Sequence, residues 1–219
     1  MLWLCWHIWK ARNDYIFNHV PVDPTEVIFK AARDAMEFVT AQVMLATSPS
    51  VFRQASGVNQ AWVSSAQGTF RVNCDVAIQP DTKVGAVVAL LRNDQGTLLD
   101  GVAMKAAIAS VLQGEVLAIR LACVMCDTLH LSRAEVEGDN QGVIKLSVSE
   151  DAPPWECAAL VADIKALAHK RGLSFRWCPR SANSAANWVA LARLGGYLPV
   201  NWVTCPPLLL VSSLSMNES

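Results

Sequence analysis

The sequence predicts a mixed α/β domain with an N-terminal helical extension, and three observations support this. Residues 69–106 contain three consecutive β-rich stretches with alternating polarity, which indicates three neighbouring strands. Between residues 113 and 194, helical runs alternate with short strands, an order typical of a sheet covered by helices. The hydrophobic fraction is 53% and the charged fraction 17%, so a packed core is readily supplied. The 219 residues fit one ordinary domain plus a smaller appendage.

The N-terminal part, residues 1–46, is predicted to be a helical remnant of something larger. Within residues 1–19, one side of a helix would carry Trp6, Trp9, Ile16 and Phe17. A second helix is expected to begin at Asp23-Pro24-Thr25-Glu26, because proline is in the first turn and acidic residues lie at the positive end of the helix dipole. Residues 47–61 are rich in turn-forming residues and are predicted to be a linker.

The main domain is predicted to span residues 62–196. We expect strands at 69–78, 84–92, 97–106, 134–137 and 173–178, and helices at 113–129, 141–149, 156–171 and 182–194. Asn93-Asp94-Gln95-Gly96 predicts a turn between the second and third strands, and Gly172 predicts a helix end. In the tail, residues 197–219, the apolar triplet Leu208-Leu209-Leu210 is expected to pack against the domain.

Charge and cysteine content restrict the environment and the partners. The formal net charge is −1, so nucleic-acid binding would need a local basic face and would be sensitive to salt. The seven cysteines are scattered and odd in number, which suits a reducing compartment better than a disulfide framework. No apolar run reaches the roughly 18 residues that span a bilayer, and no signal-peptide cleavage site is evident. We therefore expect an intracellular protein of the nucleus or cytoplasm, neither secreted nor membrane-bound.

Three acidic residues are the strongest functional signal. Asp75 lies in a predicted strand, Glu115 near the start of a predicted helix, and Asp139 at the end of a short predicted strand. Carboxylates delivered from two strands and a helix start can converge on one point, as a site for hard divalent cations requires. The sequence therefore predicts a metal-dependent phosphodiesterase.

Five short motifs, taken together, point to a family. They are Phe70-Arg71-Val72-Asn73-Cys74-Asp75, Val84-Gly85-Ala86-Val87-Val88 with the Asn93–Gly96 turn, Glu115 with Ala118, Glu137-Gly138-Asp139-Asn140, and Arg180-Ser181-Ala182-Asn183 with Ala186. In this order they resemble the type-1 ribonuclease H domain. More narrowly, they look like the ribonuclease-H-like proteins of plants that derive from reverse transcriptases of non-LTR retroelements. The resemblance covers roughly residues 62–194.

The resemblance implies both a fold and an activity. The implied fold is a five-stranded mixed sheet of order 3-2-1-4-5 flanked by helices. The first three strands form an antiparallel meander, and the fourth and fifth run parallel to the first. The implied activity is endonucleolytic hydrolysis of the RNA strand of RNA–DNA hybrids. It would use two Mg²⁺ ions, for which Mn²⁺ can substitute.

The resemblance also assigns the metal ligands. Asp75 would bridge the two metals, and Glu115 and Asp139 would complete one metal shell. At the fourth family position, usually Asp, this chain has Asn187, which offers a carbonyl oxygen but no charge. One charge pair about 4 Å apart contributes roughly 4 kcal/mol before desolvation is subtracted. Metal binding on the side of the attacking water is therefore expected to be weakened, and activity reduced or lost.

Four further residues are candidate substrate contacts. Asn73, Asn140 and Gln141 lie near the acids in sequence, where they would bind sugar hydroxyls or serve as turn and helix-cap residues. Asn140 in particular is a natural helix N-cap. Arg180 would pair with a phosphate or remain a surface residue. Upstream of the last helix, the chain has Trp177 and no histidine of the kind that helps to release product.

Other readings remain. A catalytically inactive nucleic-acid-binding module, or a folded gene fragment with neither property, fits the same motifs. The CxxC of Cys123 and Cys126 lies inside a predicted helix, where buried packing is favoured over a zinc site. The cluster His169-Lys170-Arg171 suits a helix C-terminus through the helix dipole, with backbone binding as the alternative. No protein partner is indicated, and we expect a monomer.

Overall fold

The computed structural model describes residues 2–28, 30–31, 68–79 and 81–215. It divides into two compact units, Met1–Gly57 and Val58–Ser219. The elements are α1 (Leu2–Asn18), β1 (Arg71–Gln79), β2 (Val84–Arg92), β3 (Leu98–Ala107), α3 (Val111–Thr128), β4 (Glu135–Gly138), α4 (Gln141–Val148), η1 (Trp155–Cys157), α5 (Ala158–Arg171), β5 (Ser174–Trp177), α6 (Ser184–Gly195) and α7 (Leu208–Ser215). Among these helices none is long and apolar enough to cross a membrane.

The N-terminal unit contains α1 and the start of a second helix. On α1, the indole rings of Trp6 and Trp9 stack against each other, with their centroids 5.2 Å apart. Asp23 caps the second helix as predicted, since its Oδ1 accepts the backbone N–H of Thr25 at 2.8 Å. The predicted end of this helix near residue 46 and the linker at 47–61 lie outside the described residues.

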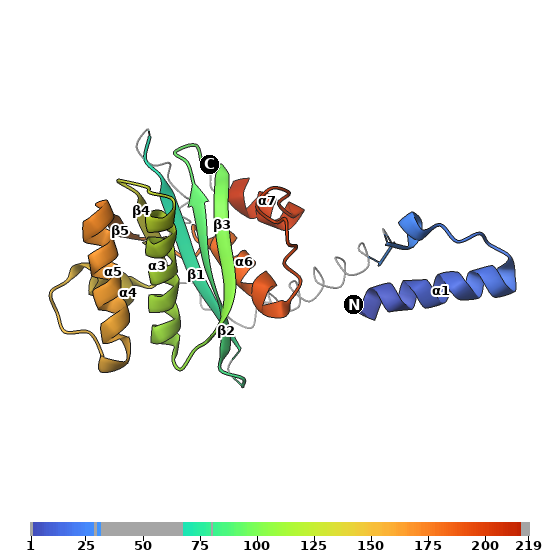
Figure 1. Ribbon diagram of the computed structural model, residues 1–219, viewed down its shortest axis with the longest axis horizontal. Helices are drawn as coiled ribbons and strands as arrows, with labels where there is room; N and C mark the ends of the chain where they lie inside the picture. Colours follow the sequence, from blue (N-terminus) through green and yellow to red (C-terminus); the bar gives the residue numbers. More distant parts are fainter. Residues whose placement is uncertain (1, 29, 32–67, 80, 216–219) are drawn as a thin grey trace, which may run out of the picture. The chain divides into compact units, whose positions relative to one another are not determined.

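A single five-stranded sheet forms the centre of the second unit, with strand order β3-β2-β1-β4-β5 (Figure 1). β1, β2 and β3 are an antiparallel meander, while β4 and β5 run parallel to β1. The predicted order and directions are confirmed. The turn between β2 and β3 is the predicted one, where the backbone N–H of Gly96 donates to the Asn93 carbonyl at 3.0 Å.

Two hydrophobic clusters lie on the two faces of this sheet. Helices α3, α4 and α5 cover one face, and α6 and α7 cover the other (Figure 1). The alternation of β1 explains the division, because Val72 and Cys74 belong to the first cluster and Ala77 to the second. β1 therefore has helices on both sides, which places it at the centre of the domain.

Three helices begin at residues other than those predicted. α3 begins at Val111, because the Ser110 hydroxyl oxygen caps it by accepting the backbone N–H of Gln113. The helix expected at 156–171 is divided into η1 and α5, and it ends at Gly172 (φ 65°) as predicted. α6 begins at Ser184, since the two residues before it form a turn.

The C-terminal tail contains a helix, α7, that the sequence did not reveal. Leu210 is fully buried in the α6 cluster, as predicted for the apolar triplet, whereas Leu208 is 75% exposed. The buried guanidinium of Arg92, at the end of β2, donates to the carbonyl oxygens of Gly96 at 2.9 Å and Leu214 at 3.2 Å. This side chain ties α7 to the sheet.

Candidate metal centre

The three predicted acidic residues converge at one point of the domain. β1 and β4 pair in parallel register up to Asn73 and Glu137, and Asp75 and Asp139 each follow that pair by two residues. They therefore both lie just beyond the point where the pairing of β1 with β4 stops. One carboxylate oxygen from each of Asp75, Glu115 and Asp139 lies within 4.8 Å of the others. Among the described residues this is the one group of three or more His, Cys, Asp or Glu side chains that could hold a metal.

Glu115 reaches the strands because α3 packs very closely on β1. It is the fifth residue of α3, one position after Gly114. A Cβ at Gly114 would lie 3.2 Å from side-chain atoms of Val76 and Ile78, tighter than an ordinary contact. Glycine thus allows the first turns of α3 to approach β1 and brings the Glu115 carboxylate to Asp75.

Asp75 is the buried member of the group, with 4% of its surface exposed. Its Oδ1 accepts the backbone N–H of Val76 at 2.8 Å, while its buried Oδ2 has no hydrogen-bond partner among the described residues. Burial, and then the charge of Asp139, raise the pKa of Asp75 to about 7. An acceptor left without a donor in such a place is what a bound cation would satisfy.

Glu115 experiences the same environment. Burial, followed by the charges of Asp75 and Asp139, raises its pKa to about 8. The guanidinium of Arg180 and a hydrogen bond from the Asn140 side chain lower this pKa only in part. With these raised pKa values, the Asp75 and Glu115 carboxyls hold protons near neutral pH when no cation is bound. Their oxygen-only donor set fits Mg²⁺ or Mn²⁺.

Asn187 lies in the first turn of α6 and is half-buried. The start of α6 is joined to β1 next to Asp75, since Asn183 Nδ2 donates to the Cys74 carbonyl oxygen at 2.9 Å. α6 thus presents its first turn near the acidic group. That the Asn187 carbonyl serves as a fourth ligand remains a prediction.

Asn140 and Gln141 begin α4 beside the acidic group. Asn140 is the N-cap, with its Oδ1 accepting the backbone N–H groups of Gly142 at 3.1 Å and Val143 at 3.2 Å. The cap role expected as its alternative is confirmed, and the same side chain also bonds to Glu115. Gln141 is the exposed first residue of α4 and remains a candidate substrate contact.

Asn73 occupies a different position from the one its sequence neighbourhood suggested. It is 1% exposed, and its Nδ2 donates to Glu137 Oε2 at 2.9 Å. In this conformation it faces the interior and not a solvent-accessible side where a sugar would bind. The predicted hydroxyl contact therefore disagrees with its burial, and its role here is to hold β1 to β4.

A buried ion-pair network next to Asn73 was missed by sequence reasoning. The Arg71 guanidinium bonds to Glu135 at 2.8 Å and to Glu137 at 3.2 Å, and Arg71 is 1% exposed. Arg176 on β5 lies 3.7 Å from Glu137. Alternating charges in these strands were visible in the sequence. Only the register of β1, β4 and β5 shows that they face one another.

Trp177 and Arg180 both contact Asp139. The indole Nε1–H of Trp177 donates to the Asp139 backbone carbonyl at 2.9 Å. The exposed guanidinium of Arg180 has its Nε 3.9 Å from Asp139 Oδ2. Arg180 therefore lies at the site as predicted. Sequence reasoning noted Trp177 but gave it no contact with an acid.

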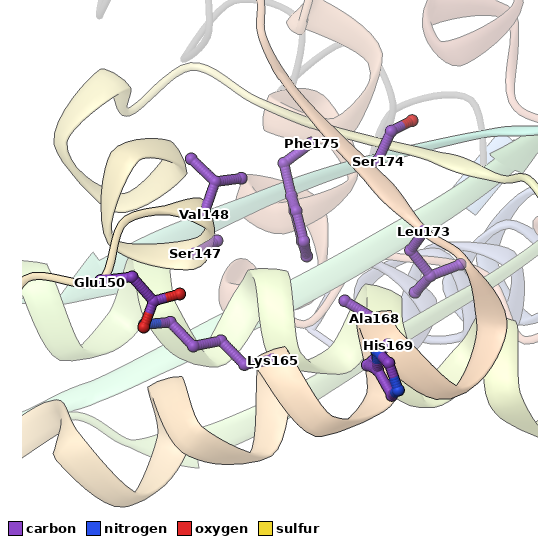
Figure 2. A pocket seen from close by; sticks show the side chains of 9 residues that line it. All are labelled: Ser147, Val148, Glu150, Lys165, Ala168, His169, Leu173, Ser174 and Phe175. Atoms are coloured by element: carbon purple, nitrogen blue, oxygen red, sulfur yellow. The ribbon is translucent and has the colours of Figure 1, made fainter.

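Other polar features lie away from this centre. A pocket of about 530 Å³ between α4, α5 and β5 is lined by Ser147, Val148, Glu150, Lys165, Ala168, His169, Leu173, Ser174 and Phe175 (Figure 2). It includes none of the three acids. The cysteines Cys123 and Cys126 are both buried within α3, as the packing interpretation predicted.

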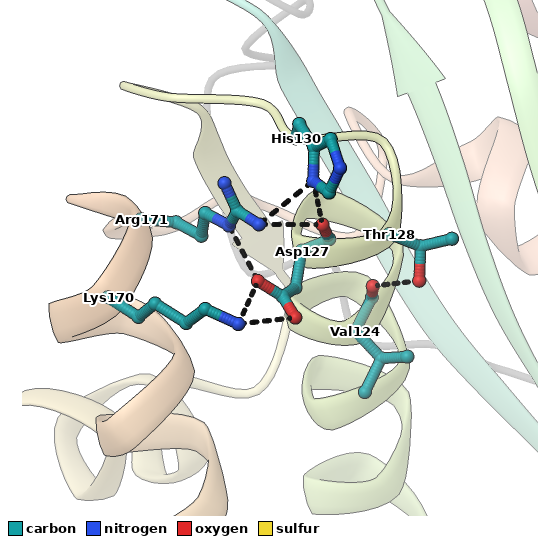
Figure 3. Close-up of polar contacts among 6 residues, drawn as sticks. All are labelled: Val124, Asp127, Thr128, His130, Lys170 and Arg171. Atoms are coloured by element: carbon teal, nitrogen blue, oxygen red, sulfur yellow. Dashed lines mark hydrogen bonds and ion pairs between the residues drawn. The ribbon is translucent and has the colours of Figure 1, made fainter.

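The basic cluster at the end of α5 has a structural partner. Lys170 Nζ lies 2.9 Å and Arg171 Nε 2.6 Å from Asp127 Oδ1 near the end of α3 (Figure 3). Both cations lower the pKa of Asp127 by hydrogen bonding to it. Two of the three basic side chains thus join α5 to α3, which favours the structural interpretation over backbone binding.

Comparison with known protein families identifies the domain. A family model described as reverse transcriptase-like matches residues 73–192, which include Asp75, Glu115, Asp139 and Asn187. The chain belongs to the reverse transcriptase-like family. The comparison with curated protein sequences finds no match.

Solved structures place this reverse transcriptase-like domain in the ribonuclease H fold. Ribonuclease H1 of the archaeon Halobacterium salinarum matches with a TM-score of 0.54 at 21% identity over 59% of this chain and 99% of its own. The N-terminal ribonuclease H domain of a Mycobacterium tuberculosis protein gives 0.54 at 17%, over 59% and 95%. The LC11 ribonuclease H1, solved with an RNA/DNA hybrid, gives 0.52 at 14%, over 59% and 99%. The predicted fold and retroelement relationship are confirmed, whereas the plant lineage remains a prediction.

Proposed function

We propose that this domain is a ribonuclease H-type endonuclease that hydrolyses the RNA strand of RNA–DNA hybrids. The observation that carries the proposal is the convergence of Asp75, Glu115 and Asp139, with the buried Asp75 Oδ2 left without a partner. Two Mg²⁺ ions, or Mn²⁺ in their place, would be held by these carboxylates and by the Asn187 carbonyl. When bound, such ions activate a water for attack on phosphorus and stabilise the departing oxygen.

The protein's own residues supply position and proton control. The three carboxyls are electrostatically coupled, because the charge of Asp139 raises the pKa values of both Asp75 and Glu115. With pKa values near 7 and 8, these two groups hold protons at neutral pH and release them when cations enter. Cation binding and proton release are therefore coupled at this site.

Contacts to the nucleic acid would come from the residues exposed around the acids. Gln141 lies at the start of α4, and Arg180 is 80% exposed beside Asp139. We propose that Arg180 binds a phosphate of the hybrid and that Gln141 binds a sugar hydroxyl. The related LC11 enzyme has been solved with an RNA/DNA hybrid, which supports this substrate class.

The cellular setting belongs to the same proposal. All seven cysteines, each within the described ranges, carry free thiols. This agrees with a reducing, intracellular compartment such as the nucleus or cytoplasm. We propose that the domain acts there as a monomer.

A second candidate is a nucleic-acid-binding module without catalysis. The observation that favours it is Asn187, which leaves the α6 side of the centre without a fourth charge. Such a module would bind hybrids in a salt-dependent manner, and Asp75→Asn would leave that binding unchanged.

The deciding experiment is cleavage of an end-labelled RNA–DNA hybrid in Mg²⁺ and then in Mn²⁺, with Asp75→Asn protein as the control. Cleavage by the wild type that disappears in the variant supports the enzyme. Folded wild-type protein that binds the hybrid but cleaves it in neither metal supports the binding module. If the folded protein shows no binding and no cleavage, both candidates are contradicted.

A further inference from the structure

The segment of residues 177–183, from the last residue of β5 to the residue before α6, contacts β1 and the residue that follows β4. It is held in a tight turn, in which the backbone N–H groups of Ala182 and Asn183 donate to the Pro179 carbonyl at 2.9 Å and 3.2 Å. From one end Trp177 reaches Asp139, and from the other Asn183 reaches Cys74, the neighbour of Asp75. A single short segment therefore contacts both chains at the point where β1 and β4 stop pairing.

The contact of Trp177 begins where the sheet hydrogen bonding stops. β4 and β5 pair up to Gly138 and Trp177, and the Cys178 backbone N–H donates to the Gly138 carbonyl at 3.1 Å. After that pair the chain leaves β4 and turns into α4. Asp139 is the first residue beyond the ladder, and the Trp177 indole N–H binds its carbonyl at 2.9 Å. The side chain thereby extends the ladder by one residue.

The contact of Asn183 repeats this arrangement at β1. Pairing between β1 and β4 ends at Asn73, and the next carbonyl, that of Cys74, accepts Asn183 Nδ2 at 2.9 Å. Asn183 is 1% exposed, so this bond is shielded from water. Side chains of the 177–183 segment thus hold two backbone carbonyls. One belongs to Asp139 itself, and the other belongs to Cys74, the residue before Asp75.

We infer that Trp177 is a positioning residue of the candidate metal centre, which fixes Asp139 in the orientation that faces Asp75 and Glu115. The inference rests on the proposed function for its consequence in metal binding, although the contact itself belongs to the metal-free protein. Trp177 is 43% exposed, so the bond adds little to overall stability. Its effect is on the direction of one carboxylate. Residues that orient ligands in this way commonly change metal affinity by about 10–100-fold.

The test compares two substitutions of the same kind. Trp177→Phe keeps an aromatic ring and removes the N–H donor. Trp155→Phe makes the same change in η1, at a side chain that is 90% exposed, and serves as the matched control. Calorimetric titration of the substrate-free proteins with Mn²⁺ is expected to show about tenfold weaker binding for Trp177→Phe and no change for Trp155→Phe.

Two further readouts separate positioning from a general structural effect. In the metal-free proteins, ¹⁵N relaxation at Asp139 and Asn140 is expected to show a loss of order in Trp177→Phe alone. In hybrid cleavage, the half-saturating Mg²⁺ concentration should rise by about the same tenfold factor, while the rate at saturating Mg²⁺ changes much less.

The outcomes distinguish this inference from the proposed function. Equal Mn²⁺ affinity and unchanged order at Asp139 in Trp177→Phe overturn the inference. A higher KM for the hybrid with unaltered metal binding also overturns it and assigns the indole to nucleic-acid contact. Wild-type protein that neither binds Mn²⁺ nor cleaves contradicts the proposed function alone, and the relaxation data on the metal-free proteins then decide the inference.

Discussion

The two ends of α3 carry acidic residues in opposite electrostatic situations. Near its N-terminal end, Glu115 faces two other carboxyls, and its pKa rises to about 8. Twelve residues and about 18 Å further along the helix, Asp127 is bound by Lys170 and Arg171, and its pKa falls. At the Asp127 end the charges are balanced within the chain, as in an ion pair that stabilises the fold. At the Glu115 end the carboxyls are not balanced within the chain, and they retain protons at neutral pH unless a cation is added.

The largest expected effect tests the unbalanced end. Asp75→Asn should abolish hybrid cleavage, by about a thousandfold or more, because it removes the most buried ligand. It should also raise the melting temperature of the metal-free protein at pH 8, since one buried carboxylate no longer has to ionise beside two others. Cleavage assays and thermal melts measure the two effects. A variant that loses activity by unfolding would show the opposite shift in melting temperature and contradict this account.

The second prediction concerns pH. Asp75 and Glu115 have folded pKa values raised to about 7 and 8, above their ordinary 3.8 and 4.5. The folded protein therefore binds more protons than the unfolded chain between about pH 4 and 8. Stability contributed by these groups is fully present below pH 4 and is lost as pH rises through 7 and 8.

The measurement is a series of thermal melts from pH 5 to 9 without metal and with Mg²⁺. Without metal, the melting temperature should fall across this range, and Asp75→Asn should flatten the fall. Added Mg²⁺ should raise the melting temperature most at pH 8–9, because cation binding favours the ionised carboxyls. Equal Mg²⁺ effects at pH 5 and pH 9 would contradict the coupling.

Asp127, whose pKa is lowered, behaves in the opposite way. Its contribution to stability is lost only under acid, as pH falls through its folded pKa.

The third prediction adds charge to the unbalanced end. Asn187→Asp should increase Mg²⁺ affinity and the cleavage rate at low Mg²⁺, each by about tenfold, because a carboxylate replaces a neutral carbonyl. Asn183→Asp is unsuitable as a control, because Asn183 donates to β1. Gln141→Glu adds the same charge at the exposed start of α4 and is the better comparison for Mg²⁺ affinity, measured without substrate because Gln141 is itself a proposed substrate contact. If both variants behave alike, the effect is general electrostatics and Asn187 is not a ligand.

The smallest effect is expected at the balanced end. Asp127→Asn should lower the melting temperature slightly and leave cleavage and Mn²⁺ binding unchanged, because ion pairs partly open to solvent contribute little and the site lies at the other end of α3. Melts and the hybrid assay check this. A marked loss of cleavage in folded Asp127→Asn protein would mean that the two ends of α3 are coupled and would remove the contrast drawn between them.

Much of the fold was predictable because its signals are local. The strands and helices of residues 71–195 lie within about two residues of the predicted ranges, since alternation, caps and turn residues such as Asn93 define them. η1 and α7 were missed. η1 is a single turn after two prolines, and α7 follows a proline-rich stretch whose helicity depends on packing against α6.

The acidic group was predictable for a different reason. Asp75, Glu115 and Asp139 each lie in a motif with a recognisable neighbourhood, so their convergence followed from the fold. Trp177, Asn183 and the buried Arg71 did not, because their partners are backbone carbonyls or residues on other strands. Such contacts depend on strand register and on where a ladder ends, and a single sequence does not contain that information in local form.

The attachment of α7 has a practical consequence for anyone who prepares the domain alone. The region that matches the family ends at residue 192, and a boundary chosen there would remove Trp202 and Leu210 from the α6 face of the sheet. It would also leave the buried Arg92 guanidinium without its Leu214 acceptor. A recombinant fragment should therefore extend through Ser215, because the segment after the family match is part of the folding unit.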